Sequence, residues 1–132
     1  MHASGTFTVN ITPQPAEDDV GDPGIGRMAL FKQFSGDLEG SAHGQMLTSH
    51  GDVAGSAAYV ALDRVTGLLH GRSGSFSLQH CGVMDRGAPQ LTVTVVPDSG
   101  NGELQGIRGN LAIRIADGQH LYEFDYTLPE PG

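Results

Sequence analysis

Alternating apolar and polar side chains along most of the chain predict β-strands rather than helices. From Ala3 to Thr12, the apolar residues Phe7, Val9 and Ile11 alternate with threonine and asparagine. This period of two is typical of a strand with one buried face, and Pro13 would end it. No stretch of ten or more residues carries the period of an amphipathic helix. The pattern therefore predicts an all-β fold.

The stretch from Ala57 to His80 is predicted to form a central β-hairpin with one buried face. Thr66-Gly67 is a plausible two-residue turn, because glycine tolerates the positive φ of tight hairpin turns. This turn would set Tyr59 opposite Gly74, and an aromatic ring over a cross-strand glycine is a known sheet device. The residues predicted to face inward are Tyr59, Ala61, Asp63, Val65, Leu68, His70, Phe76, Leu78 and His80.

A second hairpin is predicted around Ser35-Gly36-Asp37, with Phe34 opposite Leu38. This pairing turns Lys32 toward the same face as its apolar neighbours. Two interpretations of Lys32 stay open. Its ammonium group is either buried beside a carboxylate partner, or carried to the end of the barrel by a snorkelling stem.

The strongest turn signal is Asp117-Gly118, which joins the last two predicted strands, 106–115 and 119–128. Pairing Ala116 with Gln119 sets Ile113 opposite Tyr122 and predicts that both point into the core. The same register turns His120, Phe124 and Tyr126 inward. A slip by one residue would expose this whole apolar face.

Eight strands in sequence order predict one domain over residues 1–132, a closed antiparallel eight-stranded β-barrel of the up-and-down type. The segment 98–105 is predicted to be a turn with room for a short helical turn. The connections 14–26, 48–54 and 81–88 would lie at one end, which we take as the mouth, with His80 and His120 beside it. The acidic connection 14–26 is interpreted as a flexible lid or a plain connector, since it lacks the spacing and the lysine of a phosphate loop.

Composition limits the partners. The net charge is −8 with only seven basic residues among 132, so neither nucleic acid nor an anionic membrane is expected as a partner. The single cysteine allows no internal disulfide, and the chain contains no run of 18 apolar residues. These features indicate a protein of the reducing cytoplasm.

Four stretches together resemble a known bacterial family. They are YVALDRVTGLLHGRSGSFSLQH, LFKQFSGDLEGSAHGQML, VVPDSGNGELQGIRG and HLYEFDYTLP. They are similar to the family of unknown function DUF3224, over nearly the whole chain from Ala3 to Pro129. The resemblance implies a barrel like that of allene oxide cyclase, whose distant relatives bind apolar small molecules and in some cases isomerise or cyclise them. Asp63 stands where a glutamate would be expected, and Cys81 looks idiosyncratic.

No motif in the sequence specifies a reaction, so candidate residues follow from their inward positions. His80 is the principal candidate acid or base, because the pKa of an unperturbed histidine needs little adjustment at neutral pH, and Asp63 and Lys32 lie deeper. Asp63, His70 and Arg72 are also predicted to form a polar cluster, either a hydrogen-bonded network or a carboxylate with a raised pKa. The candidate ligand-binding residues are Tyr59, Phe76, His120, Tyr122 and Tyr126.

Metal and nucleophilic sites are not expected. His80 and His120 alone would give an incomplete zinc shell, and the side chains of His80 and Cys81 should diverge as strand neighbours. We therefore expect no metal and no cofactor.

Two function classes stay open: a small isomerase or cyclase, and a non-catalytic module for a hydrophobic metabolite. In both, the partner is a small apolar molecule, and both would fail if Phe7, Phe31, Phe76 and Phe124 filled the lumen. A purely structural role has less support, because the alternation shows no exposed apolar stripe, and homo-oligomerisation is left open.

Overall fold

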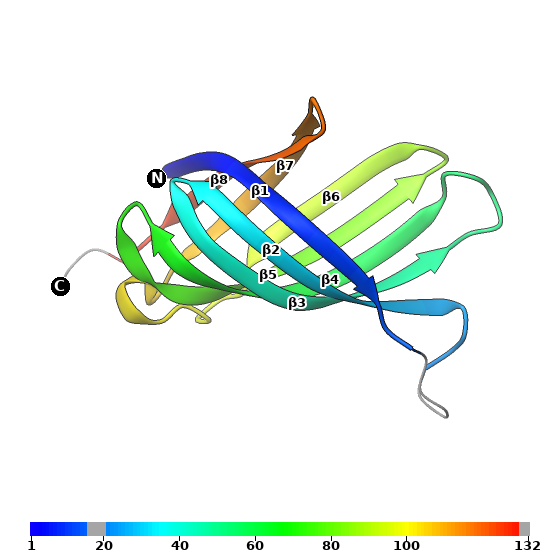
Figure 1. Cartoon of the computed structure of the whole chain (residues 1–132), viewed down its shortest axis with the longest axis horizontal. Coiled ribbons are helices and arrows are strands. Elements are labelled where there is room, and N and C mark those ends of the chain that lie inside the picture. Colours follow the sequence, from blue (N-terminus) through cyan, green and yellow to red (C-terminus); the bar gives the residue numbers. More distant parts are fainter. Residues whose placement is uncertain (16–20, 130–132) are drawn as a thin grey trace.

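Each strand pairs with its neighbours in the sequence, and β8 pairs with β1, which closes the sheet into an antiparallel barrel (Figure 1). The computed structural model describes residues 1–15 and 21–129. The elements are β1 (His2–Pro13), β2 (Ile25–Gly36), β3 (Leu38–His50), β4 (Ala57–Leu69), β5 (Arg72–Asp85), β6 (Ala88–Val95), the 3₁₀ turn η1 (Gly102–Leu104), β7 (Arg108–Ala116) and β8 (Gln119–Thr127). The predicted all-β, eight-stranded closed barrel is thereby confirmed, as is a short helical turn within 98–105.

The register of the last hairpin is as predicted. Ala116 pairs with Gln119 and Ile113 with Tyr122, around a turn in which both Asp117 and Gly118 have positive φ. Positive φ at both central residues is what a type I′ hairpin turn requires. The turn signal and the alternating apolar face together therefore predicted the pairing of β7 with β8 correctly.

The predicted register of the central hairpin is wrong. The turn lies at His70-Gly71 rather than Thr66-Gly67, so Tyr59 pairs with Gly82 and not with Gly74. The predicted and the observed register differ by an even number of residues. Along most of β4 and β5, the same side chains therefore point inward in both. Only the segment mistaken for the turn changes role: Leu69 is buried and Leu68 is exposed.

Contacts with β3 explain why Gly67 is not the turn. Gly67 pairs with Gly40 of β3, and a Cβ at either glycine would collide with the backbone of the other strand. Gly67 therefore allows β3 and β4 to approach each other closely. The true turn is held from outside the hairpin, where the backbone N–H of His70 donates to the carbonyl of Asp37 at 2.9 Å.

Two further sequence-based expectations need correction. Phe34 pairs with Gly40 rather than Leu38, a shift of two residues that leaves the faces unchanged. The segment 81–88 is mostly strand rather than loop, because β5 runs to Asp85 and only Arg86-Gly87 turn. The interpretation of 14–26 as a lid or connector falls partly outside the described residues.

The half of the barrel that holds the β2–β3 and β4–β5 turns and η1 is filled with side chains. Phe76 and Phe124 stack with ring centroids 5.8 Å apart, and both are fully buried. The hydroxyl of Tyr122 accepts a hydrogen bond from the Leu38 N–H at 2.9 Å and lies 2.9 Å from the carbonyl oxygen of Ser35, to which it donates. We call this half the closed end.

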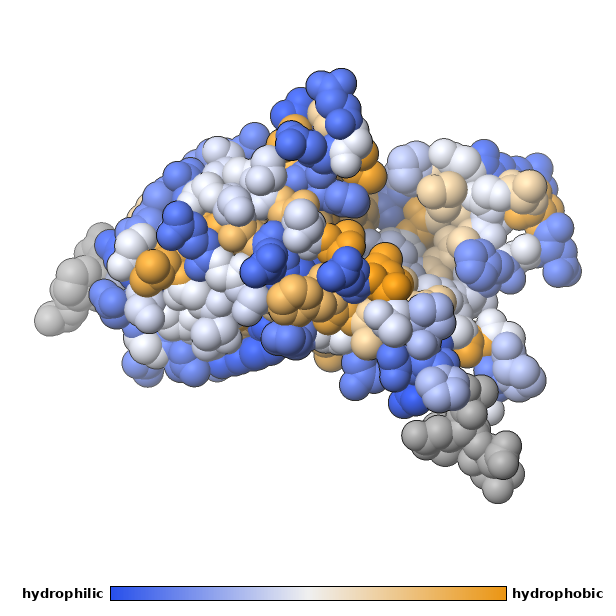
Figure 2. Space-filling view, in the orientation of Figure 1, coloured by the Kyte–Doolittle hydropathy of each residue, from blue (hydrophilic) through white to orange (hydrophobic). Residues whose placement is uncertain are grey.

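The opposite end of the barrel is splayed. β6 pairs with β7 only through Thr94 and Asn110, and β1 pairs with β8 only as far as Phe7. The β7–β8 hairpin therefore stands apart from the tip of β5 and β6 (Figure 1), and Figure 2 shows a notch between them with hydrophobic residues on its sides. Ile113 is consequently only partly buried, less than its predicted core position implied, and the side chain of Ile115 is 67% exposed.

The outer surface carries an apolar patch that the alternation did not reveal. Leu47, Val60 and Leu62 are exposed large hydrophobic residues of β3 and β4. They point away from the lumen, since their strand neighbours Ala61 and Asp63 are buried inside. The expectation of no exposed apolar stripe is therefore wrong.

Candidate functional site

Three ionisable side chains meet inside the barrel, between the closed end and the splayed mouth. Lys32 of β2, Asp63 of β4 and His80 of β5 are 6%, 2% and 3% exposed. Oδ2 of Asp63 lies 2.6 Å from Nζ of Lys32 and 2.7 Å from Nε2 of His80. Lys32 is thus the buried cation with a carboxylate partner, and the snorkelling alternative is wrong.

The distances within this triad indicate the tautomer of His80. Nε2 is closer to the Asp63 carboxylate at 2.7 Å than to Lys32 Nζ at 3.3 Å. An ionised carboxylate only accepts hydrogen bonds, so Nε2 carries the proton and donates it. In a neutral imidazole, Nδ1 is then the acceptor. Nδ1 has no hydrogen-bond partner among the described residues. In that part of the chain, the one fully enclosed side-chain N or O atom without a partner is Asp63 Oδ1, so Nδ1 of His80 keeps contact with solvent.

The second oxygen of Asp63 is unsatisfied. Oδ1 is the one fully buried side-chain N or O atom of the described residues without a hydrogen-bond partner. It lies over Gly44 of β3, where a Cβ would come within 2.5 Å of it. A glycine at this position therefore gives the carboxylate its room.

Asp63 is ionised despite its burial. Desolvation alone would raise the pKa of the carboxyl, but the hydrogen bond from His80 and the charge and hydrogen bond of Lys32 outweigh it. The pKa of Asp63 therefore lies below its ordinary value. This is the opposite of the raised pKa considered from the sequence.

The lowered pKa predicts a contribution of the triad to acid unfolding. Ionised Asp63 stabilises the fold fully above the unfolded-state pKa of about 3.9, and this stability is lost as pH falls through the lower folded-state pKa. Urea unfolding should therefore show the free energy of unfolding falling more steeply below about pH 4 in the parent than in the Lys32→Met/Asp63→Asn double variant. Equal slopes would show that Asp63 titrates alike in both states.

Beyond the triad, the mouth forms an apolar cup with a volume of about 290 Å³. Its inner boundary is formed by Tyr59, whose ring lies over Gly82, one inward position beyond His80. Burial raises the pKa of the Tyr59 hydroxyl, with a smaller contribution from the charge of Asp63. The other residues lining the cup are Met46, Thr48, His50, Ala57, Ala58, Val83, Met84, Pro89, Gln90 and Leu91.

The predicted site residues divide between the two halves of the barrel. Lys32, Asp63 and His80 come together, and Tyr59 borders them at the cup. His120 is half-buried on β8, where its ring packs on Phe7.

Three candidate ligand residues lie elsewhere. Phe76, Tyr122 and Tyr126 belong to the closed-end core, so they do not line the cup. The Tyr126 hydroxyl is hydrogen-bonded to His70, and His70 sits in the β4–β5 turn, away from Asp63. The predicted cluster of Asp63, His70 and Arg72 is therefore wrong, because it depended on the incorrect register.

Of the four phenylalanines considered as fillers of the lumen, Phe7, Phe76 and Phe124 do pack in the core. Phe31 instead alternates outward beside buried Leu30 and Lys32, and its ring contacts His43. The cup thus remains open.

Met46, Met84 and Leu91 line the cup but were not among the candidates from the sequence. Each has the inward parity of its strand. Met46 and Leu91 lie within predicted strands, where the alternation was the available signal, whereas Met84 lies in the segment 81–88 that was taken as a loop. Cys81 is exposed on the outer face, so its side chain diverges from that of His80 as predicted.

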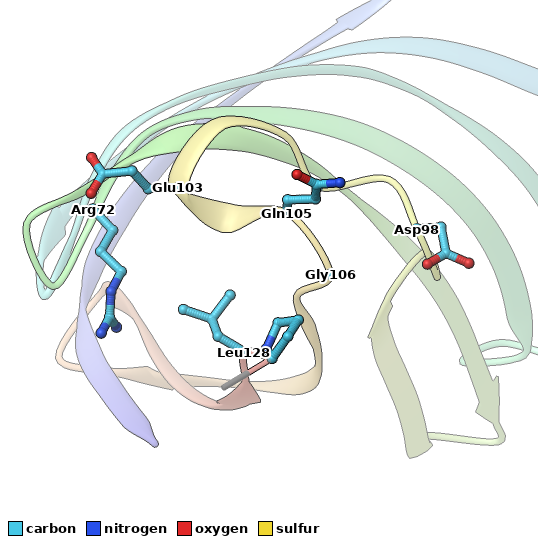
Figure 3. A pocket seen from close by; sticks show the side chains of 8 residues that line it. Arg72, Asp98, Glu103, Gln105, Gly106 and Leu128 are labelled. Carbon is cyan, nitrogen blue, oxygen red and sulfur yellow. The ribbon is translucent and has the colours of Figure 1, made fainter. Parts of the chain in front are cut away.

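A larger hollow of about 590 Å³ lies at the closed end (Figure 3). Arg72 and Glu103 lie on one side of it and Asp98 on the other, around Leu128. Its charged and polar lining residues, Arg72, Asp98, Glu103 and Gln105, are all exposed, whereas the triad beside the cup is buried. The cup beside the triad is therefore the stronger candidate.

Two further observations concern metal ligands and membrane-spanning helices. Across residues 1–15 and 21–129, no group of three or more His, Cys, Asp or Glu side chains is placed to hold a metal ion. In the same part of the chain, no helix has the length and apolar character needed to cross a membrane.

Comparison with known proteins identifies a family and a similar solved structure. Residues 3–126 match a family described as "Protein of unknown function (DUF3224)". The crystal structure of a protein of unknown function from the DUF3224 family of Shewanella oneidensis MR-1 is similar, with 48% identity and a TM-score of 0.90 over 100% of this chain and 98% of that one. No curated protein matches the sequence.

Proposed function

We propose, for a chain that belongs to the DUF3224 family of proteins of unknown function, that the cup binds a small, mainly apolar molecule and that His80 exchanges a proton with it. The observation that carries this proposal is the oriented pair of Asp63 and His80 next to an apolar cup, whose lining begins at Gly82, one inward position beyond His80 on β5. Concave, mostly apolar sites with a few convergent polar groups are the usual form of small-molecule sites.

The pair has the arrangement of a general base. Asp63 fixes the imidazole through Nε2, which leaves Nδ1 of His80 free to accept a proton. Accepting it would form an imidazolium next to the Asp63 carboxylate, which stabilises that charge. Returning the proton to a different atom of the ligand would complete an isomerisation or a ring closure. Such chemistry needs shape and one acid or base more than a nucleophile.

Non-catalytic binding is the second candidate, favoured by one observation. Lys32 donates to the same Oδ2 that holds His80, so Asp63 is shared and the triad also serves as a buried hydrogen-bonded network. In that case, His80 would orient the ligand without moving a proton. Capture of metabolites from a bacterial extract, followed by mass spectrometry of bound and released species, separates the two: an enzyme releases an isomer, a binder the same compound.

Charging the cup should abolish binding of an apolar probe. Met46 and Leu47 are neighbours on β3, but only Met46 lines the cup. A lysine at position 46 would place an unpaired ammonium in an apolar site, which is costly. With the neutral fluorophore N-phenyl-1-naphthylamine, Met46→Lys should lose the fluorescence enhancement, whereas Leu47→Lys should keep it. Enhancement that survives Met46→Lys, or that the parent never shows, would contradict the proposed site.

The remaining expectations are also proposals. The charge of −8 and the single cysteine support a cytoplasmic protein that binds neither nucleic acid nor membranes. Leu47, Val60 and Leu62 are where a homo-oligomer would be sought. Size-exclusion chromatography with light scattering would measure its mass.

A further inference from the structure

We infer that the cup selects an uncharged ligand bearing a hydrogen-bond donor, such as a phenol or an alcohol, over a carboxylate of the same shape. This inference rests on the proposed function and names the class of ligand. It follows from which hydrogen-bonding positions of the triad are filled and which are open.

Both unpaired positions of the Asp63–His80 pair are acceptors, and only one of them is open. Nδ1 of His80 has no partner and keeps contact with solvent, whereas Oδ1 of Asp63 has no partner but is fully enclosed. The single N–H of the imidazole is already used, since His80 Nε2 donates to Asp63 Oδ2, and Lys32 Nζ donates to the same oxygen from a buried position. A ligand that donates a hydrogen bond would satisfy Nδ1, whereas a ligand with acceptors alone would leave it unpaired.

The cup also offers an anion no free cation. Its lining contains neither lysine nor arginine, and the Lys32 ammonium is committed to Asp63 at 2.6 Å. A carboxylate would have to shed its water in an apolar site beside an ionised Asp63, which is expensive without a partner. The Tyr59 hydroxyl can donate a single hydrogen bond but brings no charge. His50 lines the cup, so the comparison belongs at slightly alkaline pH, where an ordinary histidine is neutral.

Three naphthalene probes of nearly one shape test this selection. 2-Naphthol is an uncharged donor, 2-methoxynaphthalene has an acceptor only, and 2-naphthoate is an anion. Dissociation constants from ¹⁵N NMR titrations should rank naphthol about fivefold tighter than the ether, the size of one ordinary hydrogen bond, and naphthoate weakest. Equal affinities for naphthol and the ether, or tighter binding of naphthoate, would overturn the inference.

Variants separate this inference from the proposed function. His80→Leu should reduce the affinity for naphthol to that for the ether, while leaving the ether unchanged. Lys32→Met/Asp63→Asn removes both charges together and should narrow the gap between naphthoate and naphthol. If the ether binds the parent but not Met46→Lys, the proposed site stands even when the ranking fails. If no probe binds, the proposed function and the inference fail together.

Discussion

Replacing Asp63 alone by alanine is expected to destabilise the barrel by about 3–5 kcal/mol, the usual cost of removing one partner from a buried ion pair. The loss would leave the Lys32 ammonium and the His80 Nε2 proton buried without their common acceptor. Domains of this size are stable by only about 5–15 kcal/mol, so the variant would unfold at much lower urea. Equilibrium urea unfolding measures the difference.

Two controls test whether the loss of stability comes from a buried charge left without a partner. Asp85→Ala removes an exposed carboxylate and should change stability by no more than about 0.5 kcal/mol. Lys32→Met/Asp63→Leu replaces both charged partners by apolar groups and should cost clearly less than Asp63→Ala alone. A single Asp63→Ala variant as stable as the parent would mean that the triad contributes no net electrostatic stability.

Gly82→Ala is expected to reduce the affinity for N-phenyl-1-naphthylamine on the order of tenfold. Overpacking a filled site typically costs about 1–3 kcal/mol, and we expect a cost of this size to appear as weaker binding. A Cβ at Gly82 would collide with the ring of Tyr59, which lies directly over this glycine. The ring is half-buried at the cup, so it should swing into the ligand space. Fluorescence titration measures the affinity.

A compensating change tests the reason for this loss. Tyr59→Ala/Gly82→Ala removes the displaced ring and should regain much of the binding that Gly82→Ala loses. Gly71→Ala is the matched control, because Gly71 lies in the β4–β5 turn at the closed end with no atom within 4 Å of a Cβ. Its positive φ should cost stability but not binding. Binding by Gly82→Ala that equals the parent would show that Tyr59 does not shape the cup.

The inward placement of the triad could be read from the alternation, but its assembly could not. Lys32, Asp63 and His80 each follow the parity of their strand, which strand geometry fixes locally. Lys32 and Asp63 lie on β2 and β4, with β3 between them. The contact of Nζ with Oδ2 at 2.6 Å lies over the inner face of β3, and it depends on how the closed sheet curves there. The alternation predicts on which face of the sheet a side chain lies, whereas the distance between two side chains depends on the shape of the whole barrel.

The sequence by itself determined the strand count, the inward faces and the Asp117-Gly118 hairpin, because each follows from backbone geometry within a few residues. The tertiary structure alone decided where β4 turns, since Gly67 is needed for close approach to Gly40 and the true turn is held by Asp37. It also decided that β7 leaves β6 after a single bridge, which opens the cup. These outcomes depend on competition between distant partners for the same backbone groups, and that competition is settled only when the barrel closes.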